Sequence, residues 1–145
     1  LAQYNPTELI LTGGEPLLNE LTFIDTLRFA MRAMMVDSIK DIWLYSASWN
    51  EGLPLLLPYL SGATFTIHES DWREDFERMS KTLLAYEKRF GPRLHNRLRI
   101  DSRVPRTEIN AVMRYNGPWQ EINVFDWKPD GNCPLPADEQ LFILR

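Results

Sequence analysis

The sequence predicts an α/β fold: a largely parallel sheet built from βα repeats. Short apolar runs alternate with segments of helical periodicity about four times along the chain. The apolar runs are mostly uninterrupted, as in parallel sheets whose faces are both covered or that close into a barrel. The chain has 145 residues, 44% of them hydrophobic and 25% charged, which is enough to bury a core and excludes a disordered or collagen-like chain.

Five short apolar runs are the expected strands. The first is stopped by Gly13-Gly14, and each of the others is followed by a polar residue. Because helical segments separate them, the strands should run parallel with right-handed crossovers. They span residues 8–12, 42–45, 63–67, 98–101 and 122–125.

The first two helices are predicted from a cap and from a proline. Thr22 can cap a helix whose apolar residues recur at spacings of four, three and four, namely Phe23, Leu27, Ala30 and Met34. Residues 51–60 should form only a short or bent helix, because Pro58 has no N–H to donate to the carbonyl group of Pro54.

The third helix has the clearest pattern in the chain. It should open at Ser70-Asp71 and stop at Gly91-Pro92. Its apolar positions are spaced four, three, four, three and four: Trp72, Phe76, Met79, Leu83, Tyr86 and Phe90. A short fourth helix is expected over 107–114, closed by Asn116-Gly117.

We expect two parts in the chain: a βα core over residues 1–127 and a C-terminal loop with a short apolar tail over 128–145. The first residue is Leu1 rather than methionine, which we interpret as a cut end. If a strand is missing before residue 8, the sheet edge beside Ile10 should be unpaired within this chain. The apolar run Leu141–Leu144, or a partner chain, could cover it.

Composition excludes several classes of function. The formal net charge of −4 argues against general electrostatic binding to nucleic acid or to an anionic membrane. The longest uncharged stretch, 52–67, is too short and too rich in proline to span a membrane. A single cysteine, Cys133, excludes an internal disulfide and any multi-cysteine metal site made by this chain alone. No secretory signal opens the sequence, so we expect a cytoplasmic protein.

Positive charge gathers in one segment. Residues 88–106 carry seven basic side chains against the single acid Asp101, and they surround the expected fourth strand. Such a segment is either a solvated surface or a face turned toward an anionic ligand.

Ligands of parallel α/β sheets bind at the carboxyl ends of the strands, so the residues that follow each strand are the candidates. These are Gly13–Pro16, Ser46–Ser48, His68-Glu69, Asp101–Arg103 and Asp126-Trp127. The first group is the most informative. Gly13 and Gly14 permit a positive φ and close approach of a ligand to the backbone, and Pro16 ends the strand. Glu15 places a carboxylate there, which suits a ligand with an ammonium group rather than a phosphate. A plain glycine turn is the alternative.

The run Leu9-Ile-Leu-Thr-Gly-Gly-Glu-Pro-Leu-Leu18 resembles the strand and loop that bind the methionyl amino group in the radical S-adenosylmethionine (radical-SAM) family. In that family the motif ends the second strand of a partial (β/α)6 barrel of the TIM type. The later strands at residues 42, 63, 98 and 122 then match the third to the sixth strands. The similar pattern covers residues 8–127, although only the Gly-Gly-Glu-Pro run is specific.

The resemblance implies the S-adenosylmethionine (SAM)-binding portion of an enzyme. Such enzymes cleave SAM reductively to a 5′-deoxyadenosyl radical, which abstracts hydrogen from a substrate that this sequence does not identify. The implied SAM-contacting residues are Gly13, Gly14, Glu15, Pro16, Ser46, His68 and Asp101.

One requirement of the family is not met. The reaction needs a four-iron four-sulfur cluster held by a Cys-x3-Cys-x2-Cys loop before the Gly-Gly-Glu-Pro strand, whereas Cys133 lies in the C-terminal tail. This chain alone is therefore not expected to be active. Either an upstream segment supplies the cluster, or the chain is a degenerate, cluster-less relative that binds a ligand or a partner protein without catalysis.

Several other polar residues allow two interpretations, one functional and one structural. His68 either approaches the ligand or is satisfied at the edge of the core, whereas His95 is expected in a surface loop. Arg99 and Asp101 share one face of their strand, as a buried clamp or as a solvated pair. Neither the histidines nor the serines suggest a zinc site or a Ser-His-Asp triad. The tryptophans and the group Met31, Met34 and Met35 are most simply core.

Overall fold

The computed structural model describes residues 5–68, 71–115 and 117–126, in which strands and helices alternate as the sequence predicts. The elements, in chain order, are β1 (Glu8–Leu11), α1 (Glu20–Ala33), β2 (Asp41–Ser46), α2 (Leu53–Leu56), η2 (Leu57–Tyr59), β3 (Gly62–Ile67), α3 (Arg73–Phe90), β4 (His95–Asp101), α4 (Arg106–Met113) and β5 (Glu121–Phe125).

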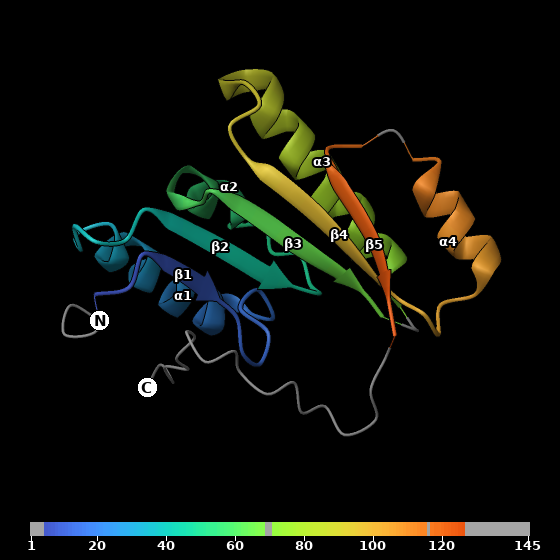
Figure 1. The fold of residues 1–145 in the computed structure, drawn as a ribbon, viewed down its shortest axis with the longest axis horizontal. Coiled ribbons are helices and arrows are strands. Elements are labelled where there is room, and N and C mark those ends of the chain that lie inside the picture. Colours follow the sequence, from blue (N-terminus) through green and yellow to red (C-terminus); the bar gives the residue numbers. More distant parts are fainter. Residues whose placement is uncertain (1–4, 69–70, 116, 127–145) are drawn as a thin grey trace.

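The five strands form one parallel sheet in the order β1-β2-β3-β4-β5. The predicted parallel arrangement is confirmed, so the carboxyl ends of all five strands lie at the same edge (Figure 1). Within the described residues β1 pairs only with β2, and the side chain of Ile10 is 37% exposed. This edge is unpaired as predicted, whereas the run Leu141–Leu144 lies outside the described residues.

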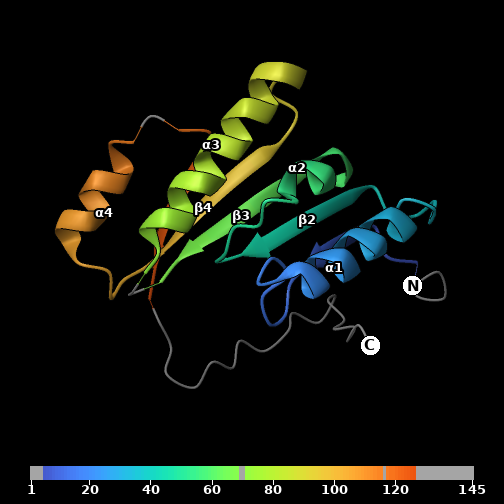
Figure 2. The same cartoon turned by 180° about the vertical axis from the view of Figure 1, so that it is seen from behind.

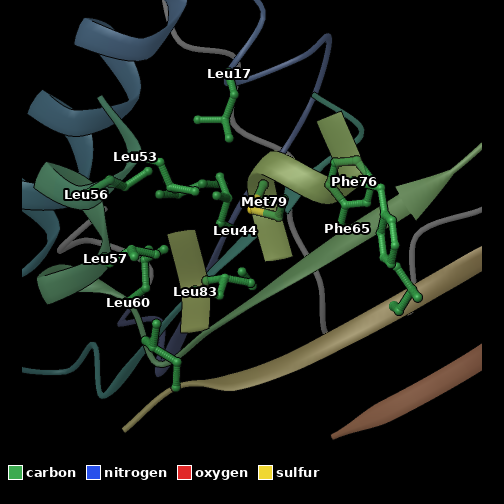
Figure 3. Packing of buried hydrophobic residues seen from close by; sticks show 14 of the residues in the cluster. Leu17, Leu44, Leu53, Leu56, Leu57, Leu60, Phe65, Phe76, Met79 and Leu83 are labelled. Carbon is green, nitrogen blue, oxygen red and sulfur yellow. The ribbon is translucent and has the colours of Figure 1, made fainter. Parts of the chain in front are cut away.

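All the helices lie on one face of the sheet, which Figures 1 and 2 show from opposite sides. The core fills the space between the two layers, and Figure 3 shows its centre. There Leu44 and Phe65 from the sheet meet Met79 and Leu83 of α3, all of them at most 1% exposed. The predicted packing of the first and third helices against the sheet is confirmed.

No helix among the described residues covers the opposite face of the sheet. On β4 the residues directed toward the helices are buried, whereas Arg97 is half-buried and Arg99 is exposed on the other face. Of the two arrangements that the apolar strands predicted, cover on both faces is therefore wrong for the described residues, and closure into a barrel stays a prediction. The sequence obscured this, because Trp43 and Tyr45 on the uncovered face of β2 look as apolar as core residues.

Helix boundaries differ from the prediction where the cap was misjudged. Asn19, not Thr22, is the N-cap of α1: its side chain accepts from the N–H of Thr22, and the Thr22 hydroxyl accepts from the N–H of Asn19. The third helix begins at Arg73 with Trp72 as its N-cap, and the fourth begins one residue earlier than expected. The prediction of a short helix over 51–60 is confirmed: α2 has four residues and is followed by a 3-10 turn at Leu57–Tyr59, where Pro58 lacks an N–H.

Several residues assigned to the core are exposed. Met31, Met34 and Met35 are 47%, 57% and 84% exposed, because the buried stripe of α1 runs through Phe23, Thr26, Ala30 and Ala33. Phe90 at the end of α3 is also exposed. His95, expected in a loop, is the first residue of β4. Trp43, expected in the core, lies on the uncovered face with His95 against the edge of its ring.

Candidate functional site

The loop after β1 has a backbone that only glycine adopts without strain. Gly13 and Gly14 have φ values of +90° and +60°. A Cβ at either position would meet nothing within 4 Å, so the requirement for glycine comes from the backbone conformation and not from crowding. Both glycines are exposed.

Three contacts fix this loop against the rest of the fold. Leu17 is fully buried in the core (Figure 3). The hydroxyl of Thr26 on α1 donates to the carbonyl oxygen of Pro16 at 3.3 Å, and the side-chain amide of Asn50 donates to that of Leu17 at 3.4 Å. The loop therefore has its outer half in solvent and its inner half held by two neighbouring segments.

Glu15 bridges from this loop to the end of β2. Its Oε2 accepts from the N–H of Ala47 at 2.9 Å, and its Oε1 accepts from the hydroxyl of Ser46. The Ser46 oxygen in turn accepts from the N–H of Ser48 at 3.1 Å. A carboxylate offers about four acceptor positions. Two remain on Glu15 after these bonds, and the residue is only half-buried, so a cationic donor can reach it.

Asp101, at the end of β4, is fully buried and is surrounded by Arg103. It accepts from the Arg103 backbone N–H at 2.9 Å and from the guanidinium Nη2 at 2.7 Å, with further bonds from Nε. These hydrogen bonds hold the pKa of Asp101 below its ordinary value, against the opposing effect of burial. Nδ1 of the exposed His68 lies 3.8 Å from Oδ2 of Asp101, the oxygen that also binds Nη2 of Arg103.

The predicted site residues thus lie at one edge in two groups. Gly13, Gly14, Glu15, Pro16 and Ser46 gather where β1 and β2 end, and His68 and Asp101 lie together where β3 and β4 end. Among the described residues, no hydrogen bond or ion pair joins Glu15 to His68 or to Asp101.

Arg99 and Asp101 do not pair. The guanidinium of Arg99 lies over the ring of Phe125, 4.4 Å from its centroid, while Asp101 binds Arg103. Both share the face that sequence parity predicts, but Arg103, in the turn that follows the strand, binds the carboxylate through its backbone and side chain. The sequence signal for this was present, since an aspartate commonly bonds to the backbone two residues later.

The described part of the chain contains neither a metal-binding cluster nor a membrane-spanning helix. It contains no group of three or more histidine, cysteine, aspartate or glutamate residues that could hold a metal ion. Cys133 lies outside the described residues. None of the described helices is long and apolar enough to cross a membrane.

Sequence reasoning missed the contribution of backbone and amide groups. The N–H of Ala47 and the side chain of Asn50 position the loop, yet neither belongs to a motif. It also missed Arg97 and Thr64 on the uncovered face, which only the alternation of side chains along β3 and β4 could have indicated.

Comparisons of this chain with protein-family models, with curated proteins and with solved structures found no match. Functional inference therefore depends on the chain's own residues.

Proposed function

We propose that this chain is the SAM-binding portion of a radical-SAM enzyme, with the glycine loop after β1 as the site for the methionyl end of SAM. The proposal joins the resemblance of Leu9–Leu18 to that family with the geometry of the loop. It includes the finer statement of fold, that the sheet is part of a (β/α)6 partial barrel. The consecutive strand order and the helices on one face support this, since a barrel wall has the same order and one-sided cover.

The observation that carries the proposal is the position of the Glu15 carboxylate. Ser46 and the N–H of Ala47 fix it at the strand edge, and two of its acceptor positions are left for a ligand. An ammonium group has three donors, which the carboxylate and the exposed peptide carbonyl oxygens of the loop can accept together. This set of acceptors therefore fits the methionyl amino group.

The other candidate residues take different roles. Ser46 positions Glu15 and does not itself face the ligand. His68 is exposed at the neighbouring strand end, and we assign it to the ribose hydroxyls. Asp101 has its oxygens engaged by Arg103, so we assign it to holding the loop after β4. When bound beside a reduced cluster, SAM supplies the hydrogen-abstracting chemistry of the family, and this chain's residues bind and orient it.

The described residues do not fit an iron-sulfur cluster. They contain no cysteine, and the sequence has only Cys133, whereas the family's cluster takes three thiolates. A cluster would need an upstream Cys-x3-Cys-x2-Cys segment.

The test is the affinity of the chain for SAM, measured by calorimetry. Replacing Glu15→Gln keeps the size of the side chain and removes its charge. It should weaken binding by about 1.5–3 kcal/mol, the range for a hydrogen bond to a charged group. Glu20→Gln, at the exposed start of α1, makes the same charge change five residues away and should leave the affinity unchanged.

An analogue of SAM without the amino group separates this contact from general effects. Its binding should be the same for the parent chain and for Glu15→Gln. Equal losses of both ligands would show that Glu15 supports the loop and does not contact the ammonium group, and the assignment would fail.

A cluster-less ligand-binding or interaction module is the second candidate, favoured by the single cysteine. Anaerobic incubation of this polypeptide with iron and sulfide should leave it colourless, because one thiol cannot hold a four-iron cluster. A stoichiometric cluster would contradict the upstream placement of its ligands. SAM binding that depends on Glu15 favours the enzyme portion, and absence of SAM binding favours the module.

A further inference from the structure

The uncovered face of the sheet carries an arginine that lies on two aromatic rings. The guanidinium carbon of Arg97 on β4 is 4.5 Å from the ring centroid of Trp43 and 5.6 Å from that of Tyr45, both on β2. Gly62 on β3 is the register partner of Trp43, and a Cβ there would come within 2.1 Å of the His95 carbonyl oxygen and 2.5 Å of the Trp43 ring. The glycine therefore lets the indole lie across the neighbouring strand, and the arginine lies above it.

Two polar groups of this region are buried without a hydrogen-bond partner among the described residues. One is Nε of Arg97, and the other is the hydroxyl of Thr64, a residue that is 2% exposed. Thr64 and Arg97 are register partners on adjacent parallel strands, so both side chains leave the sheet on the same face. Buried polar groups are nearly always satisfied, so these two neighbouring groups leave hydrogen-bonding capacity for a partner outside the described residues.

Three carboxylates on this face of the sheet have other partners. Glu121, the register partner of Arg97 on β5, binds Nε2 of His95. Asp101 binds Arg103, and Asp41 accepts from the hydroxyl of Ser61 at 2.8 Å. Within the described residues, none of the ion pairs involves Arg97.

We infer that Arg97 and Thr64 form a binding site for the oxyanion of a small ligand, a carboxylate or a phosphate. A guanidinium stacked on aromatic rings keeps its edge donors free for a planar, bidentate acceptor. The Thr64 hydroxyl adds a donor from the adjacent strand. Arg99, two residues further on the same face, adds positive potential. Of the two alternatives for the basic segment 88–106, the inference adopts the face turned toward an anionic ligand.

The occupant is a small molecule because the chain as a whole is acidic and repels long polyanions. Tyr45 directly precedes Ser46, so the site lies next to the glycine-loop edge along β2. If the proposed function is correct, this ligand is the substrate that is acted on beside SAM. The inference of an anion site does not depend on the proposed function.

The test follows the side-chain N–H signals of Arg97 and Trp43 by ¹H–¹⁵N NMR while inorganic phosphate or benzoate is added at constant ionic strength. Arg97→Lys and Trp43→Phe identify the two signals. We expect both to shift saturably with at least one of the two anions, and the comparison of the two shows whether phosphate or carboxylate is preferred.

Variants place the binding on these residues. Arg97→Gln should weaken the anion affinity by about tenfold or more, and Thr64→Val, which keeps the volume, by severalfold. The matched control is Arg89→Gln: Arg89 also lies over an aromatic ring, 5.1 Å from the centroid of Phe90, but on the exposed end of α3. It should change the affinity less than about twofold, the scale of an exposed charge.

Three results would overturn the inference. The first is a shift that grows linearly with either anion and does not saturate. The second is an equal loss in Arg89→Gln. The third is an Arg97 Nε–H signal that does not respond, as expected if Thr64 itself accepts that hydrogen bond. If Arg97→Gln does not fold, the parent titration and Thr64→Val decide. Glu15→Gln should bind both anions normally, which separates this test from that of the SAM site.

Discussion

Two carboxylates follow strands at the same edge of the sheet, yet their surroundings differ. Glu15 after β1 is half-buried and is held by one hydroxyl and one backbone N–H. Asp101 at the end of β4 is fully buried and is enclosed by the guanidinium and backbone of Arg103. Only the first has acceptor positions left for a ligand. A carboxylate at the ligand-binding edge of a parallel sheet can therefore be either a ligand contact or a support for the loop beside it, and its bonding partners decide which.

The largest expected effect is on stability and comes from Asp101→Asn. An amide keeps one acceptor but loses the charge that binds Arg103, so we expect a loss of about 2 kcal/mol in the free energy of unfolding. Urea unfolding at neutral pH measures it. Glu15→Gln should lose less than about 1 kcal/mol, because its carboxylate is more solvated. A larger loss of stability in Glu15→Gln than in Asp101→Asn would contradict the assignment of Asp101 as the structural carboxylate.

The pairing of Asp101 with Arg103 also makes the stability of the fold depend on pH. Arg103 lowers the pKa of Asp101 in the folded chain, so the folded state favours the charged carboxylate. This stabilisation is fully present above the ordinary aspartate pKa of about 4 and is lost as the pH falls through the lower folded-state pKa. The difference in unfolding free energy between the parent chain and Asp101→Asn should therefore shrink below about pH 4. A difference that stays constant down to pH 2 would contradict the charge-based account.

Ser46→Ala tests whether Glu15 needs its support. Without the hydroxyl, the carboxylate keeps the N–H of Ala47 but is less well oriented. We expect the SAM affinity to fall by about 0.5–1.5 kcal/mol, less than for Glu15→Gln. Ser48→Ala is the control, because Ser48 contacts Ser46 through its backbone. Equal effects of the two substitutions in calorimetry would remove Ser46 from the site.

The smallest expected effect on stability is that of His68→Gln. The histidine is 52% exposed and its Nδ1 lies 3.8 Å from Asp101, so their attraction is screened by solvent. The unfolding free energy at neutral pH should change by no more than about 0.5 kcal/mol. A loss close to that of Asp101→Asn would mean that the buried carboxylate depends on two cations and that the contrast with Glu15 has been described incompletely.

Several features of the fold could be predicted because they depend on local chemistry. The order of strands and helices follows from apolar runs and spacings, and the shortness of α2 follows from a missing N–H at Pro58. The positive φ values of Gly13 and Gly14 could also be anticipated, because a glycine pair directly after a strand permits them. The exposed Met31, Met34 and Met35 could not, since helical spacing does not say which of two neighbouring apolar stripes faces the sheet.

By itself the sequence determined the alternation of elements, the parallel sheet and the edge at which Gly13, Glu15, His68 and Asp101 lie. Periodicity and turn chemistry act over a few residues, and parallel pairing then fixes which ends meet. Only the tertiary structure decided that Asp101 binds Arg103 and not Arg99, that Glu15 bridges to β2, and that Arg97 lies on the rings of β2. The physical reason is that hydrogen bonds and stacking act over a few ångströms, so each partner is chosen by side-chain direction between strands far apart in the chain.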